Sequence, residues 1–151
     1  MTESKLSFKI WDEPKDHGEI KEAYQVRKTV FVDEQGFPES VELDDKDQLS
    51  IHFVLYSDDK PIGNVRLIKF DDYLKLSRMA VLKEHRGKGY GSMICKKAID
   101  YFKNTSDKTL FKVESQSHAA GFYESFGFKK VSEEVIIENA PHFRMEMKKG
   151  D

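Results

Sequence analysis

The sequence LKLSRMAV at residues 74–81, followed by RGKGYG at residues 86–91, decides the fold of this chain. Alternate residues of the first segment share one side, which predicts a strand. The glycines of the second segment let the backbone approach an anion closely. Apolar residues recur at helical spacing from Ile94 to Phe102, so a helix follows, and the free N–H groups of its first turn point toward the same anion. This strand–loop–helix unit predicts a phosphate-binding site.

Strands and helices continue on both sides of this unit. Before it, we expect a strand at residues 7–11, a helix opened by a capping box of Asp16 and Glu19, and a hairpin of residues 51–56 and 62–70. After it, we expect a strand at residues 110–114, a short helix at 119–126, and two closing strands at 128–137 and 142–147. This order predicts an α/β (α+β) fold, in which a mixed central sheet carries helices on both faces.

The segment of residues 39–48 is rich in acidic side chains, among them Glu42, Asp44, Asp45 and Asp47. Such a segment is commonly a solvated loop. It could instead present negative charge to a cationic substrate. Both interpretations stay open from the sequence.

The length and charge of the chain limit its organisation and its partners. With 151 residues, it fits one domain, residues 1–151, with a self-sufficient core. Its 25 basic and 27 acidic residues give a net charge of −2, which predicts neither nucleic-acid nor membrane binding. Residues 1–10 do not resemble a signal peptide, and no window approaches the roughly 18 apolar residues that span a membrane. Cys95 is the single cysteine, which suits a reducing compartment, so we expect a cytoplasmic protein.

The glycine spacing disfavours two large classes of phosphate-binding protein. It is not the G-x-G-x-x-G pattern of nicotinamide and flavin domains, and the chain contains no G-x-x-x-x-G-K-[ST] loop of kinases and NTPases. The five histidines are scattered without metal-ligand spacing, so we expect no metal.

Two motifs resemble those of the GNAT superfamily of N-acetyltransferases. RGKGYG at residues 86–91 is similar to the family's R-x-x-G-x-G signature, and QSHAAGFYESFGF at residues 116–128 is similar to its A-x-x-F-Y-x-x-x-G-F segment. Further stretches of the sequence resemble the ElaA-like subgroup of this family. These are residues 30–35, which follow Arg27; the single residues Asp44 and His52; the pair Arg66-Leu67; and residues 141–145.

The resemblance implies that acetyl-CoA is the acyl donor and lies between two splayed strands of the sheet. It implies that the donor is bound by Met79, Ala80 and Val81 of the strand, by Arg86, Gly87, Lys88, Gly89, Tyr90, Gly91 and Ser92 of the loop and helix start, and by Gln116, Ala119 and Phe122 of the second motif. Tyr123 stands where the family usually carries its general acid, so its hydroxyl would protonate the departing CoA thiolate.

The acceptor amine must be neutral when it attacks, so a base has to take its proton. Histidine titrates nearest neutrality, with a reference pKa of about 6.5. We therefore favour His142 as the catalytic base and place Glu34 next, with Glu114 and His52 as further candidates. Cys95 lies among apolar helix residues and is expected to be an inert thiol.

The sequence thus predicts transfer of an acetyl group from acetyl-CoA to a primary amine of a small molecule or peptide, by direct attack in a ternary complex. The alternative is a CoA-binding sensor or interaction module that keeps the loop but has lost turnover. Trp11, Phe31 and Phe37 are candidates for lining an acceptor pocket. The identity of the acceptor, the acyl-chain preference and a homodimer stay open.

Overall fold

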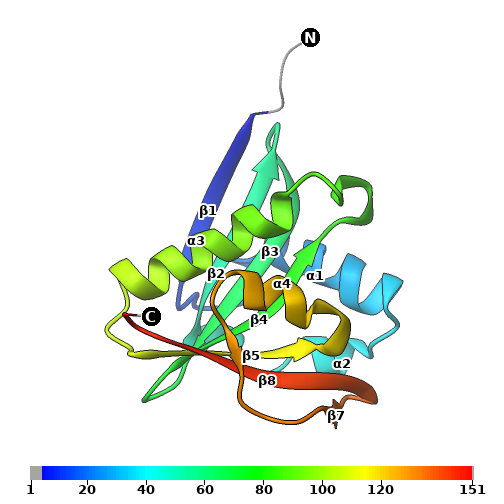
Figure 1. The fold of residues 1–151 in the computed structure, drawn as a ribbon. Coiled ribbons are helices and arrows are strands. Elements are labelled where there is room, and N and C mark those ends of the chain that lie inside the picture. Colours follow the sequence, from blue (N-terminus) through cyan, green and yellow to red (C-terminus); the bar gives the residue numbers. More distant parts are fainter. Residues whose placement is uncertain (1–4, 151) are drawn as a thin grey trace.

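One eight-stranded sheet runs through the computed structural model, which describes residues 5–150 (Figure 1). Its strands are β1 (Leu6–Asp12), β2 (Ser50–Ser57), β3 (Lys60–Lys69), β4 (Leu74–Val81), β5 (Leu110–Gln116), β6 (Lys129–Lys130), β7 (Val135–Ile137) and β8 (Ala140–Lys148). The order across the sheet is β1-β2-β3-β4-β5-β8-β6, and β7 also pairs with β8. The β4–β5 pair is parallel and the others are antiparallel, so the sheet is mixed, as predicted.

Helices cover both faces of this sheet (Figure 1). The helical elements are α1 (Lys21–Arg27), the π-helix η1 (Lys28–Glu34), α2 (Glu39–Glu42), η2 (Asp47–Leu49), η3 (Lys83–His85), α3 (Tyr90–Asn104), η4 (Ser117–Ala119) and α4 (Ala120–Ser125). Strand β2 shows the two faces, because Phe53 packs in the large core beneath α3 whereas Val54 packs with Ile20 and Ala23 beside α1. Each buried apolar side chain of this kind contributes roughly 1.5–3 kcal/mol.

Strands β4 and β5 separate after a short parallel contact. Only residues 74–76 of β4 pair with residues 111–113 of β5. Beyond this point β4 continues along β3 to Val81, whereas β5 continues along β8 to Gln116. The two strands are therefore splayed, as predicted, and no described strand pairs with the open edge of β4.

A bulge interrupts β4 at Arg78. Asn64 of β3 stands opposite Ala80, while Arg66, two residues on, stands opposite Ser77, so β4 holds one residue more than its partner. Arg78 has a φ of 52°, in the left-handed region that a non-glycine residue seldom adopts. Asn64 Nδ2 donates to the Arg78 carbonyl oxygen at 3.0 Å, which holds the bulge in place.

Two predictions about secondary structure are wrong, one on where a helix begins and one on the continuity of a strand. The Asp16 and Glu19 pair does bond, since Asp16 accepts from the Glu19 N–H at 3.2 Å, but it closes a turn ahead of the helix. The helix itself begins at Lys21, and Ile20 at its N-cap gives no side-chain cap bond. The strand expected at residues 128–137 is broken into β6 and β7, because the Ser132 hydroxyl accepts from the Arg144 N–H at 2.9 Å in place of a backbone carbonyl.

The acidic segment forms part of a buried ionic cluster. Glu42 and Asp47 are only 1% and 2% exposed. The fully buried Arg27 binds Glu42 and also donates to Asp47 at 2.9 Å. Arg66 donates to Asp47 at 2.9 Å and to Asp44 at 2.7 Å. The interpretation as a solvated loop is therefore wrong for these carboxylates, and the arginines also remove the support for a surface that attracts cations.

We expect Asp47→Asn to destabilise the protein most at neutral pH. Burial raises the pKa of Asp47, but Arg27 and Arg66 outweigh it and lower the pKa from 3.8 to about 2. Each pKa unit is worth about 1.4 kcal/mol, so the carboxylate stabilises the fold by about 2 kcal/mol above pH 4, and this contribution is lost as the pH falls toward 2. Urea unfolding of wild type and variant at several pH values measures the difference.

Asp45→Asn is the matched control, since Asp45 lies in the same segment with its side chain 88% exposed. Its free energy of unfolding should stay within about 0.5 kcal/mol of wild type. Equal losses in the two variants, or an Asp47→Asn deficit that persists at pH 2, would contradict the assigned role of the cluster.

Candidate active site

A cavity of about 520 Å³ lies between the splayed parts of β4 and β5. Residues 77–81 of β4 form one side, and residues 114–116 of β5 form the other. Side chains from α4 and from the start of β8 also line the cavity, and so does the segment that follows η1. The cavity thus occupies the place where the sheet lacks its ladder of hydrogen bonds.

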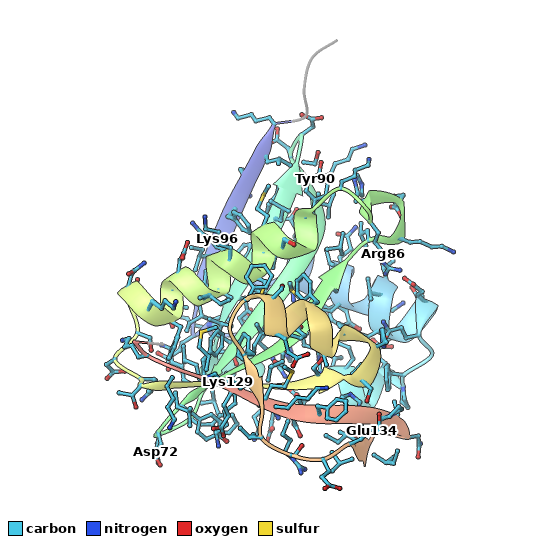
Figure 2. The ribbon with its side chains drawn as sticks, in the orientation of Figure 1. Asp72, Arg86, Tyr90, Lys96, Lys129 and Glu134 are labelled. Atoms are coloured by element: carbon cyan, nitrogen blue, oxygen red, sulfur yellow. The ribbon has the colours of Figure 1, made fainter. Side chains whose placement is uncertain are left out.

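The glycine-rich loop reaches this cavity at the start of α3. Gly87 and Gly89 have φ values of 79° and 82°, which require glycine because a side chain would be strained there. Gly89 is the N-cap of α3, and Gly91 lines the cavity. Figure 2 shows Arg86 and Tyr90 at this end of the helix. The N–H groups of the first helical turn and the helix dipole make this end suited to an anion.

Arg86 and Glu34 bind each other in a bidentate ion pair. The two guanidinium–carboxylate contacts measure 2.6 and 2.7 Å, and Arg86 Nε also donates to the Val81 carbonyl oxygen at 2.9 Å. The hydrogen bond from Arg86 lowers the pKa of Glu34, which makes this carboxylate a weaker base. The pair joins the π-helix η1 to the loop beside the cavity.

The structure places about half of the predicted site residues in the cavity wall. Those that line it are Met79, Ala80, Val81, Gly91, Gln116, Ala119, Phe122, Tyr123 and His142. The others belong to the loop, to the first turn of α3 and to η1, and they do not line the cavity; they are Arg86, Gly87, Lys88, Gly89, Tyr90, Ser92 and Glu34. The two sequence motifs thus meet at one cavity, with the loop at its edge.

Tyr123 lines the cavity from α4 and is 7% exposed. Its ring packs edge-on against Phe122 and Phe128. Burial raises the pKa of its hydroxyl well above 10, so the group stays protonated at neutral pH. Cys95 lies in the same core, and burial raises the pKa of its thiol to about 12.

His142 lines the cavity from the start of β8, where it stands opposite Gln116 of β5. Its Nδ1 lies 2.8 Å from the Ala140 carbonyl oxygen, and since a carbonyl only accepts, Nδ1 carries the proton in this contact. In the neutral ring, Nε2 is then left with a lone pair that can accept a proton. This arrangement is the one that a general base requires.

The two remaining candidate bases differ in position. Glu114 lines the cavity, but it is bound by Lys75 and lies 3.5 Å from Arg144. Burial raises the pKa of Glu114, but these cations outweigh it and lower the pKa overall. His52 lies outside the cavity wall, with Nε2 at 2.8 Å from the Asp47 carbonyl oxygen, and burial lowers its pKa to about 4. His52 therefore serves the buried ionic cluster.

Two of the three aromatic residues predicted for an acceptor pocket line the cavity, and cationic residues that the sequence did not single out line it as well. Phe31 and Phe37 line the cavity as expected, whereas Trp11 packs beside α1 instead. Arg78 and Lys75 also line it, although strand alternation gave no reason to single them out. The position of Arg78 depends on a bulge with a left-handed residue, which a pattern of apolar and polar residues does not reveal.

Among residues 5–150, no group of three or more His, Cys, Asp or Glu side chains is arranged to hold a metal ion. Within the same residues, no helix is both long and apolar enough to cross a bilayer.

Comparisons with known proteins agree with this architecture. The profile of the acetyltransferase (GNAT) domain matches residues 18–149. The uncharacterized N-acetyltransferase YjcF of Bacillus subtilis is 36% identical over 132 residues, which cover 87% of this chain and 94% of that protein. ElaA of Escherichia coli is 30% identical over 126 residues, which cover 80% of this chain and 82% of that protein.

Two solved structures share the fold. The crystal structure of Escherichia coli ElaA superposes with a TM-score of 0.85 over 95% of this chain and all of that one, at 24% identity. An acyl-CoA N-acyltransferase from Pseudomonas aeruginosa superposes with a TM-score of 0.84 over 94% of this chain and 99% of that one, at 22% identity. The matched domain, the identity to YjcF and the splayed strands lead to one conclusion: this chain belongs to the GNAT family of acetyltransferases, with ElaA among its relatives.

Proposed function

We propose that this protein, acting as one domain, transfers an acetyl group from acetyl-CoA to a primary amine of a small molecule or peptide. The observation that carries the proposal is that one cavity between β4 and β5 borders the glycine loop and is lined by both Tyr123 and His142. The same fold in the Pseudomonas aeruginosa protein belongs to an acyl-CoA N-acyltransferase, which supports an acyl-CoA donor here.

The donor would bind along the open edge of β4. Residues 79–81 line the cavity and have no strand partner on that edge, so their backbone can bond the amide groups of the pantetheine arm. A backbone N–H in this stretch would also stabilise the oxyanion that forms on the thioester carbonyl, an effect worth about 3 kcal/mol for a single donor. The pyrophosphate would lie on the N–H groups at the start of α3.

The acceptor amine would attack the thioester carbon directly. The C–N bond forms first and gives the tetrahedral oxyanion, and the C–S bond breaks when that intermediate collapses. His142 Nε2 is free to take the proton that the amine loses. Tyr123 gives its hydroxyl proton to the departing thiolate sulfur. Burial raises the pKa of the Tyr123 hydroxyl, so the group is still protonated when the thiolate leaves and can donate to it.

Acetyl-CoA and CoA should stabilise the protein against heat, whereas ATP and NADH should not. At a hundred times its dissociation constant, a ligand adds about 2.7 kcal/mol, which is a rise in Tm of roughly 5–10 °C for a chain of this length. Gly89→Ala should strongly reduce this rise in Tm. An alanine is strained at the left-handed φ of 82°, so the backbone would change conformation and the N–H groups of the loop would no longer point at the ligand. Differential scanning fluorimetry measures both effects.

Gly36→Ala is the matched control, since Gly36 has a φ of 80° but lies outside the loop. It should lower the Tm of the free protein to a similar extent and leave the rise caused by acetyl-CoA unchanged. If acetyl-CoA and CoA produced no rise in wild type, the proposed function would be wrong.

Tyr123→Phe should lower kcat by about a hundredfold or more, because the departing thiolate loses its proton donor. The ring and its packing are kept, so the rise in Tm with acetyl-CoA should stay as in wild type. Steady-state kinetics of CoA release with an amine found by screening give kcat. A variant with full kcat would exclude Tyr123 as the acid, while a lost Tm shift would indicate damage to the donor site.

His142→Gln should reduce turnover far more than Glu34→Gln. His142 lines the cavity with Nε2 able to accept, whereas Glu34 lies beside it in the ion pair with Arg86. We expect about a hundredfold loss of kcat for His142→Gln and less than fivefold for Glu34→Gln. The reverse order of the two losses would assign the base to Glu34.

A further inference from the structure

The glycine-rich loop has few contacts that hold its backbone in place. A Cβ atom built on Gly87, Gly89 or Gly91 would meet no heavy atom within 4 Å beyond its chain neighbours, so open space borders the loop at all three positions. That space suits a bound anion, but it also means that packing does not fix the backbone there. Among the described side chains of residues 83–92, the hydrogen bonds to other elements all come from Arg86.

The Arg86 side chain bonds the end of β4 on its open edge. The trans peptide group between Val81 and Leu82 has its carbonyl and its N–H on opposite sides. The Leu82 N–H donates to the Ile62 carbonyl oxygen of β3 at 2.9 Å, so the Val81 carbonyl points away from β3 and toward the open edge. Arg86 Nε donates to this carbonyl at 2.9 Å. The guanidinium therefore lies where the donor strand ends and the loop begins.

Glu34 fixes the direction of this guanidinium. Its two carboxylate oxygens accept from the two terminal nitrogens of Arg86 at 2.6 and 2.7 Å, a bidentate geometry that aligns the planes of both groups. All three guanidinium nitrogens thus donate to the protein, and Arg86 does not line the cavity. The pair connects η1, the end of β4 and the loop, and it is placed to set the position of the loop.

The effect of this pair should be local. The side chains of Arg86 and Glu34 are 40% and 33% exposed, and ion pairs that water and salt can screen contribute little to the stability of a whole fold. Backbone N–H groups, however, bind an anion well only where they converge on it. A binding site made of such groups therefore depends on the contacts behind it that hold the backbone in position.

We propose that Glu34 is a positioning residue for the acyl donor, and that it acts through Arg86. By holding the guanidinium against the Val81 carbonyl, Glu34 sets the loop at the distance from β4 that CoA requires. The pyrophosphate then meets the N–H groups of the loop while the pantetheine arm lies along the strand. This inference rests on the proposed function, and it assigns to Glu34 a role in the affinity for the donor instead of a role in proton transfer.

Glu34→Gln should weaken the binding of acetyl-CoA about tenfold, because the amide cannot accept two charge-assisted hydrogen bonds from Arg86. Removal of a negative charge near an anionic ligand would by itself strengthen binding, so the direction of the change separates positioning from general electrostatics. S-Acetylpantetheine lacks the pyrophosphate and the nucleotide, and it should bind wild type and variant within about twofold. Isothermal titration measures acetyl-CoA, and NMR titration measures S-acetylpantetheine.

Asp33→Asn is the matched control. Asp33 precedes Glu34 in η1 and lies 3.4 Å from Lys28 of the same element, so this variant removes one negative charge but leaves the bonds of Arg86 intact. Its dissociation constant for acetyl-CoA should stay within about twofold of that of wild type. Arg86→Gln should weaken binding at least about tenfold. Adding Glu34→Gln to Arg86→Gln should change the dissociation constant by less than about twofold, since Glu34 acts through Arg86.

Several results would overturn the inference. They are unchanged or tighter binding of acetyl-CoA by Glu34→Gln, an equal weakening of S-acetylpantetheine, and an equal loss in Asp33→Asn. A fall of more than about 5 °C in the Tm of free Glu34→Gln would overturn it too, because the pair would then serve the stability of the whole fold. In each case, a rise in the Tm of wild type with acetyl-CoA still supports the proposed function. If that rise is absent, the proposed function fails, and this inference fails with it.

Discussion

The separation of β4 from β5 is the constraint on which the site depends. Parallel pairing stops after residues 74–76, since β5 turns its next residues to β8 while β4 stays with β3. An unpaired strand edge in the interior of a sheet leaves backbone donors and acceptors that need partners. The cavity provides room for a ligand that supplies them, and α3 and α4 bring the glycine loop and Tyr123 to the same opening.

The buried ionic cluster decides the chemical character of the opposite wall. Isolated buried charges are costly, so the carboxylates of the acidic segment persist only because Arg27 and Arg66 bind them. This pairing ties α1, the acidic segment and β3 together, and with Arg78 it balances three carboxylates of a stretch that looks anionic in sequence. Arg78, which lies at the β4 bulge, also contacts Glu42 and Asp44 and lines the cavity beside them.

Much of this could be predicted from the sequence. The glycines, the helix after them and the alternating strands follow from local rules, so the sheet and α3 were predictable, whereas the place of the second motif in the same site was implied by the resemblance to the GNAT family. Local rules could not show that Glu42 and Asp47 are buried, because their partners Arg27 and Arg66 are distant in sequence. Nor could they show the break at Ser132, where one hydroxyl replaces a backbone acceptor, or the pairing of Glu34 with Arg86.

The environment of Cys95 has a practical consequence. Its side chain is fully buried on the core-facing side of α3, and burial raises the pKa of its thiol to about 12, so almost none of it is thiolate at neutral pH. Thiolates, not thiols, react with electrophilic dyes. Cys95 is the only cysteine of the chain, so a thiol-specific chromogenic reagent added to the folded protein would react with liberated coenzyme and hardly at all with the protein.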